Sequence, residues 1–131
     1  MKVAFATDNE KTLSSHFGSA AGFIIYNIRD HKIISEEHRT NRYTGHPRGL
    51  KGPEAYDQHH HEAILELLSD CDIVVANVIG KKIFYDLKLA GKEVLLTEET
   101  DINFALNSLL GNKLHEYPEN LVLAKILYNG G

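Results

Sequence analysis

The amino-acid sequence predicts an α/β protein in which helices cover both faces of a mixed β-sheet. Short apolar runs alternate with longer segments whose apolar residues recur every three or four positions, the pattern of buried strands joined by amphipathic helices. Two further runs flank a short polar turn near the amino terminus, which adds a β-hairpin to the sheet. The predicted order is therefore β-β-β-α-β-α-β-α.

The first three predicted strands lie at the start of the chain. Val3–Thr7 is an apolar run that ends at the turn former Asp8, so we expect a buried strand in the centre of the sheet. Gly22–Ile28 and Lys32–Glu37 flank the turn Arg29–His31 and form the predicted hairpin. Because the second arm is more polar, we expect it at the edge of the sheet.

Helices and strands alternate over the rest of the predicted core. The first helix has Asp57 as its N-cap and an apolar stripe that includes Ile64 and Leu67, and it ends near Ser69. Each of the two later helices ends at a glycine, which is a common C-terminal stop. The remaining elements are the strand Ile73–Ala76, the helix from Gly80 to Gly91, the strand Glu93–Thr97 and the helix from Asp101 to Gly111.

Two segments lie outside these elements. Residues 40–58 contain three Gly, two Pro and no regular periodicity, which predicts a long loop. Within residues 112–131, the apolar run Leu121–Leu127 fits either an added strand or a short helix, with a role in dimerisation as one option. We therefore expect a single domain over residues 1–131, with a core that ends near residue 111 and a C-terminal extension.

Composition and charge exclude several classes of protein. The chain has 131 residues with eight His and one Cys, so one copy can form neither an intramolecular disulfide nor a metal site of four cysteines. The formal net charge of -4 and the pI of about 6.0 argue against nucleic-acid binding, which needs a clustered positive surface. No apolar run approaches the roughly 20 residues of a membrane span and no signal peptide is recognisable, so we expect a cytoplasmic protein.

Candidate functional residues are predicted to meet at one edge of the sheet, because ligands of open α/β sheets bind beyond the carboxyl ends of the strands. Asp8 ends the first strand, and Asn77 ends the strand that follows the first helix. That helix runs antiparallel to the strand after it, so its first residues should reach the same edge. The predicted site consists of Asp8, His16, Phe17, Gly18, His59, His60, His61 and Asn77.

The histidines of this set point to a metal. Neutral imidazole binds zinc, iron, copper and nickel, so His16 and one or two of the three consecutive histidines would hold a simple divalent transition metal or a cluster. Successive helical residues point about 100 degrees apart, so His59, His60 and His61 cannot all bind one ion. His60 is in phase with Ile64 and should point toward the sheet. The alternative is a polar helix start with one capping or core histidine.

The other histidines and the cysteine are expected to be structural. His31, His38 and His115 are single histidines, and a single histidine is most often structural. Cys71 lies about 16 Å beyond His60 along the helix direction, at the opposite end of the sheet from His16. We expect a buried structural cysteine there, while a role as a ligand between subunits stays open.

Two other functions fit parts of the sequence. Asp8 and Glu62 would be members of the carboxylate site of a metal-dependent phosphohydrolase, although Asn77 stands where a third acid is needed. Between Arg39 and Lys51 the chain has four Arg or Lys and no acid, which fits a small-anion sensor. The cations proposed for that sensor are Arg42, Arg48 and Lys51, with the nearby helix start.

Four segments together resemble the dinitrogenase iron-molybdenum cofactor biosynthesis family over about residues 1–110: Met1–Asp8, Ser15–Ala20, His59–Glu62 and Asp70–Val75. The resemblance implies a three-layer α/β/α domain with a five-stranded mixed sheet in a ribonuclease H-like arrangement. It also implies a protein that binds or carries an iron-sulfur or iron-molybdenum cluster, or its precursor, rather than an enzyme. Its partners would be cluster donor and acceptor proteins, and the residues in contact with the cluster would be His16 and His59–His61.

Overall fold

The computed structural model describes residues 1–41 and 62–111 of the chain. Its elements follow the predicted order, with a 3-10 helix added between the first two strands. They are β1 (Lys2–Thr7), η1 (Phe17–Ser19), β2 (Gly22–Arg29), β3 (Lys32–Thr40), a helix over 62–67, β4 (Ile73–Ala76), α2 (Lys81–Leu89), β5 (Glu93–Leu96) and α3 (Ile102–Leu110).

The described strands form one five-stranded mixed sheet in the order β3-β2-β1-β4-β5. β1 pairs in parallel with β4, which pairs in parallel with β5, while β2 runs antiparallel to both of its neighbours. The prediction of a central first strand is confirmed, and Val3, Ala4 and Phe5 have no exposed surface. The polar strand β3 lies at the edge, as predicted.

The hairpin is tighter and its second arm is longer than the sequence predicts. The turn has only two residues, Asp30 and His31, with φ of 53° and 61°, as expected for a hairpin turn that twists with its strands. β3 continues past Glu37 to Thr40, so the predicted end at residue 37 is wrong. An edge strand tolerates polar residues because it is partly exposed, and pairing with β2 extends β3 through His38 and Arg39.

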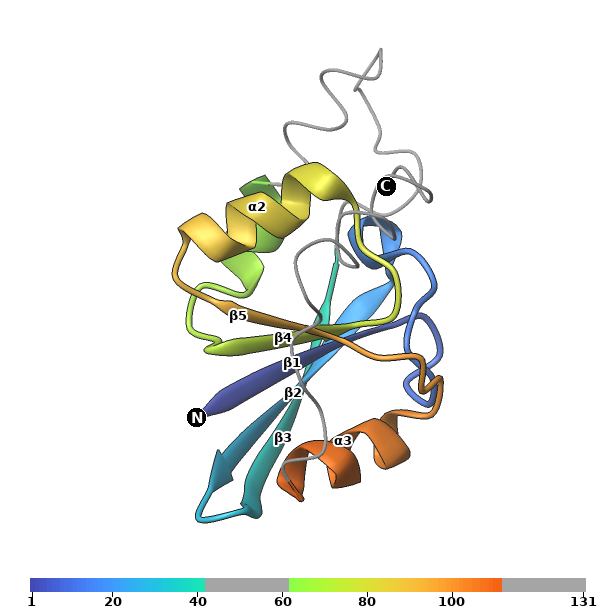
Figure 1. Cartoon of the computed structure of the whole chain (residues 1–131), viewed down its shortest axis with the longest axis vertical. Helices are drawn as coiled ribbons and strands as arrows, with labels where there is room; N and C mark the ends of the chain where they lie inside the picture. The colour runs from blue at the N-terminus through green and yellow to red at the C-terminus, as the bar shows by residue number, and fades with distance from the viewer. Residues whose placement is uncertain (42–61, 112–131) are drawn as a thin grey trace.

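Helices cover both faces of the sheet, which confirms the three-layer prediction (Figure 1). On one face, Ile64 of the first helix, Leu68 just after it and Leu87 of α2 pack against inward residues of the strands. On the other face, Ala105 and Leu106 of α3 pack against Phe5 and its neighbours. The predicted start of the first helix at Asp57 lies outside the described residues. No helix in the described part of the chain is long and apolar enough to span a membrane.

Both later helices begin where the sequence predicts, and α3 also ends as predicted, whereas α2 ends at Leu89, two residues before the predicted Gly91. Gly80 precedes α2, and Asp101 caps α3 by accepting a hydrogen bond from the backbone N–H of Phe104 at 3.2 Å. Gly111 follows the last turn of α3. The strands β1, β4 and β5 therefore all end at one edge of the sheet, where their following loops meet.

Candidate functional site

The turn after β1 is fixed by two small polar side chains. The buried hydroxyl of Thr7 accepts a hydrogen bond from the backbone N–H of Glu10 at 2.9 Å and donates to the carbonyl of Thr12 at 2.6 Å. The Asn9 side-chain oxygen accepts from the backbone N–H of Lys11 at 2.9 Å and of Thr12 at 2.8 Å. Such side-chain bonds to nearby backbone groups stabilise a turn, so the chain leaves the sheet in a defined direction.

Asp8 joins the two ends of the loop that carries the predicted metal ligand His16. One carboxylate oxygen of Asp8 accepts a hydrogen bond from the backbone N–H of Ala21, thirteen residues further along the chain, at 2.9 Å. The Asp8 side chain is otherwise exposed at the predicted edge. It therefore holds both ends of the loop over residues 8–21.

The three predicted site residues of this loop lie in different environments. His16 is exposed, and its backbone N–H donates to the Ser14 hydroxyl at 3.1 Å, so its backbone is held at the surface. Phe17 is fully buried and packs edge-to-face on Phe23, with ring centroids 5.4 Å apart. Gly18 is half-buried within η1. Phe17 thus anchors the loop in the core and keeps His16 at the surface.

Asn77 connects the loops that follow the parallel strands. Its side-chain nitrogen donates to the carbonyl of Thr97 at 2.9 Å, and the neighbouring Val78 carbonyl accepts from the backbone N–H of Phe17 at 3.2 Å. The loops after β1, β4 and β5 are therefore linked to one another. We refer to residues 8–21, 77–80 and 97–100 as the site edge, which holds Asp8, His16 and Asn77 as the topology argument predicts.

Other predicted ligands fall outside the described residues. His59, His60 and His61 belong to this group, as do the three cations proposed for an anion sensor. In residues 1–41 and 62–111, no three His, Cys, Asp or Glu side chains are grouped so that they could hold a metal ion. The described residues thus supply no carboxylate cluster for a two-cation phosphohydrolase, even though Asp8 and Glu62 are among them.

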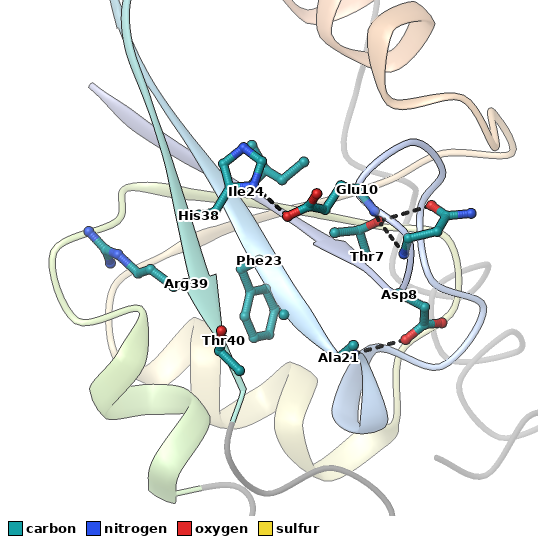
Figure 2. Close-up of a pocket in the computed structure, with 11 residues that line it drawn as sticks. Thr7, Asp8, Glu10, Ala21, Phe23, Ile24, His38, Arg39 and Thr40 are labelled. Atoms are coloured by element: carbon teal, nitrogen blue, oxygen red, sulfur yellow. Dashed lines mark hydrogen bonds and ion pairs between the residues drawn. The ribbon is translucent and has the colours of Figure 1, made fainter.

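A cleft of about 330 Å³ opens beside Asp8, between the turn after β1 and the ends of β2 and β3 (Figure 2). It contains a histidine that the sequence prediction set aside as structural. The ring of His38 lies between two carboxylates, with Nδ1 2.8 Å from Glu10 and Nε2 2.6 Å from Glu36. These carboxylates raise the pKa of His38 above its ordinary value, mainly through the hydrogen bond to Glu36. The sequence signal was the alternation of Glu36 and His38, which places both on one face of a strand.

A charged cluster connects the carboxyl end of β3, where Arg39 also lines the cleft, with Lys2 on β1 and the turn before β4. Arg39 donates from both terminal nitrogens to the Asp70 carboxylate, at 2.6 and 2.9 Å, and also binds Glu37 at 2.7 Å. It further donates to the carbonyl of Leu67 at 2.8 Å. Lys2 completes the set with a 2.8 Å contact to Asp70. We refer to Lys2, Glu37, Arg39 and Asp70 as the Asp70 cluster.

Cys71 is buried next to this cluster, in agreement with the expected structural role. Burial raises the pKa of its thiol to about 11, so the reactive and metal-binding thiolate is suppressed at neutral pH. The residue comes just before β4, at the end of the sheet opposite to His16. In one chain it is therefore unsuited to ligate a metal at the site edge.

Comparison with known proteins agrees with the arrangement of these elements. The model of the dinitrogenase iron-molybdenum cofactor family matches residues 1–112. No curated protein sequence matches the chain.

Solved structures share the fold. The apo form of the orange protein from Desulfovibrio gigas superposes with a TM-score of 0.67 at 17% identity, covering 88% of this chain and 92% of its own. A proposed NifB protein from Thermotoga gives 0.64 at 24% identity, covering 88% and 91%. A proposed dinitrogenase from Methanocaldococcus jannaschii gives 0.65 at 17% identity, covering 89% and 94%. At these identities the likeness concerns the fold alone.

Proposed function

The chain belongs to the dinitrogenase iron-molybdenum cofactor family, and from this premise we propose that it binds or carries a metal cluster or its precursor at the site edge. The cargo would be an iron-sulfur or iron-molybdenum cluster used in the biosynthesis of a metal cofactor, as in nitrogen fixation. The protein would hold and transfer this cargo rather than catalyse a reaction. Cluster donor and acceptor proteins are the partners that such a role requires.

The observation that carries the proposal is the position of His16. Its ring is exposed at the carboxyl ends of the parallel strands, where α/β proteins bind ligands, while Phe17 beside it is anchored in the core. Because the loop that carries His16 is already ordered, less conformational entropy is lost when its side chain binds a metal. His16 is therefore our first proposed metal ligand.

The other proposed ligands come from the start of the first helix. One or two of His59, His60 and His61 would join His16, while Asp8, Phe17, Gly18 and Asn77 would shape the edge around the cargo. Histidine ligands without a cysteine favour a site that releases its metal readily, because thiolates are the stronger ligands for iron-sulfur clusters. Where further ligands are needed, a second copy of the chain would supply them in a homodimer.

Three further statements belong to the same proposal. The sheet order β3-β2-β1-β4-β5, with only β2 antiparallel to its neighbours, supports a ribonuclease H-like arrangement. We propose that residues 1–131 form a single domain with the core described above. We also propose that the protein acts in the cytoplasm, where its cluster donors and acceptors would be found.

Anaerobic reconstitution tests the proposed cargo. The full chain is incubated with iron and sulfide, with and without molybdate, and desalted before metal analysis. We expect metal and acid-labile sulfide to be retained by the wild type, and retention to fall about tenfold in His16→Ala, since one ligand of few is lost. The His60→Ala variant should lose metal in the same way.

The matched control is His31→Ala. His31 is also an exposed loop histidine, but it contacts the Leu110 carbonyl at the end of α3 rather than the site edge. Its variant should retain metal like the wild type. Equal retention in His16→Ala and His31→Ala, or no retention by the wild type, would refute the proposed site.

A further inference from the structure

The ring of His38 joins two parts of the chain that are distant in sequence. Nδ1 lies 2.8 Å from a carboxylate oxygen of Glu10, in the turn after β1, and Nε2 lies 2.6 Å from a carboxylate oxygen of Glu36, on the same strand. Both distances are those of charge-assisted hydrogen bonds. The three residues are partly exposed to solvent, so the ring can exchange protons.

These contacts need a doubly protonated ring. An ionised carboxylate only accepts hydrogen bonds, whereas a neutral imidazole has one N–H and one lone pair. Both contacts can therefore be made only by the imidazolium. After loss of one proton, a lone pair would face a carboxylate oxygen and one of the two contacts must break.

The surroundings of His38 show which contact would break. Glu36 is two residues away on the same strand, so its position depends little on the contact. Ile24 lies opposite His38 on β2 and carries no charge, and Tyr26 beside it faces Glu36. Glu10 is thus the only charged partner of His38 from another element within the described residues.

The contact with Glu10 is the longer and the more exposed of the two, and the backbone of Glu10 is also strained. Its φ of 67° lies in the left-handed region, which residues other than glycine adopt at a cost. The backbone N–H of Glu10 is held by Thr7, but the Glu10 side chain is fixed to β3 only by His38. Without this contact the turn loses its side-chain link to β3, while it keeps the hydrogen bonds to Thr7 and Asn9. Glu10 and His38 both line the cleft next to Asp8, as Figure 2 shows.

We propose that His38 is a proton-operated clasp that joins β3 to the turn after β1 and closes one wall of the cleft. Because its pKa is raised in the folded protein, the clasp is closed below that pKa and opens as the pH rises through it. Opening would loosen the turn that leads into the loop over residues 8–21. The inference does not depend on which ligand the site edge binds.

Imidazole NMR of the full chain at a series of pH values tests the contact. We expect Glu10→Gln and Glu36→Gln each to lower the titration midpoint of His38, because each removes a carboxylate that stabilises the imidazolium. Glu98→Gln, which removes an exposed acid outside the cleft, should leave the His38 midpoint unchanged. If the titration midpoint of His38 is the same in Glu10→Gln as in the wild type, the proposed contact between His38 and Glu10 is refuted.

Amide hydrogen exchange tests the consequence for the turn. After correction for the intrinsic effect of pH, exchange of residues 9–12 should rise roughly threefold above the His38 midpoint, the size expected for a partly exposed ion pair. In His38→Gln and in Glu10→Gln, exchange should be fast at every pH. If the wild type shows the same protection on both sides of the midpoint, His38 titrates without operating a clasp and the inference fails.

Discussion

Two regions of the molecule, the Asp70 cluster and the site edge, are stabilised in different ways. In the Asp70 cluster, ion pairs join charged side chains that are distant in the sequence, such as Arg39 and Asp70. The Arg39 side chain is only 14% exposed. At the site edge, polar side chains such as Asp8 and Asn77 bind backbone groups instead. The charges of the Asp70 cluster thus bind strands and a turn to one another, while the polar side chains of the site edge fix loops.

Because of this difference, the residues that stabilise the sheet are not the residues proposed to bind a ligand. Both terminal nitrogens of Arg39 are hydrogen-bonded within the Asp70 cluster, and the neighbouring Cys71 is buried with a raised thiol pKa. At the site edge the ring of His16 stays exposed, because its loop is held by backbone contacts and by Phe17. A ligand can therefore bind at the edge without displacing interactions that hold the sheet together.

The largest expected effect concerns backbone geometry near the site edge. A Cβ atom on Gly22 would lie 2.6 Å from the carbonyl oxygen of Arg39, which is backbone and cannot swing away. Gly22→Ala should force β2 and β3 apart where they line the cleft and lower the free energy of unfolding by about 3 kcal/mol. Urea denaturation measures this loss, and it should be insensitive to salt because no charge is involved.

The matched control is Gly91→Ala. Gly91 has a φ of 84°, and within the described residues no atom beyond its chain neighbours lies within 4 Å of the added methyl group, so the penalty comes from the backbone conformation. We expect a loss of about 1 kcal/mol there. If Gly22→Ala is no more destabilising than Gly91→Ala, close backbone approach does not explain the glycine at position 22.

An intermediate effect is expected at the Asp70 cluster. Arg39→Met keeps much of the apolar stem but removes the hydrogen bonds to Asp70, Glu37 and Leu67, so the free energy of unfolding should fall by about 2 kcal/mol. Arg29→Met, at an exposed position in the same hairpin, should change it by less than about 0.5 kcal/mol. Equal effects of the two substitutions would show that the cluster adds no stability.

The free energy of unfolding, measured as the pH is lowered, should show the contribution of the Asp70 cluster separately from that of the site edge. Hydrogen bonds from Arg39 and Lys2 hold the pKa of Asp70 well below its usual range. The resulting stability is present above the unfolded-state pKa and is lost as the pH falls through the lowered folded-state pKa. Asp70 is partly exposed, so solvent screening limits the effect. In Asp70→Asn this part of the acid-induced loss should be absent.

The smallest expected effect concerns Asp8. Asp8→Ala removes the acceptor for the Ala21 N–H and should cost about 1 kcal/mol, with faster amide exchange at Ala21. Asp8→Asn keeps an acceptor oxygen and should restore most of that protection. If exchange at Ala21 is the same in wild type and Asp8→Ala, the carboxylate does not hold the loop.

Much of the fold could be predicted from the sequence, because burial in the core restricts which positions of a strand or helix are apolar. Val3–Thr7 is apolar at nearly every position. A strand needs this pattern only when both of its faces are buried. Asp101 and Gly111 mark the limits of α3 because a helix end needs a cap. The length of β3 was not predictable in the same way, since His38 and Arg39 are polar and only the partner strand β2 decides their conformation.

The site was predictable only where topology alone places a residue. Asp8 and Asn77 follow neighbouring parallel strands, so both must lie at the same edge. The burial of Phe17 had no local signal, because the same residue would be exposed if the loop took another path. The contact of His38 with Glu10 joins residues far apart in sequence, and no spacing rule predicts such a pair.

The sequence by itself determined the layers, the central strand and the edge at which loops converge, because these follow from apolar periodicity and chain direction. It also determined that one chain has no thiolate set for a cluster. Tertiary structure alone decided that Arg39 reaches the turn before β4 and that His38 faces two acids. Long polar side chains take their partners from whatever the folded backbone brings near, and that proximity is set only once the sheet is assembled.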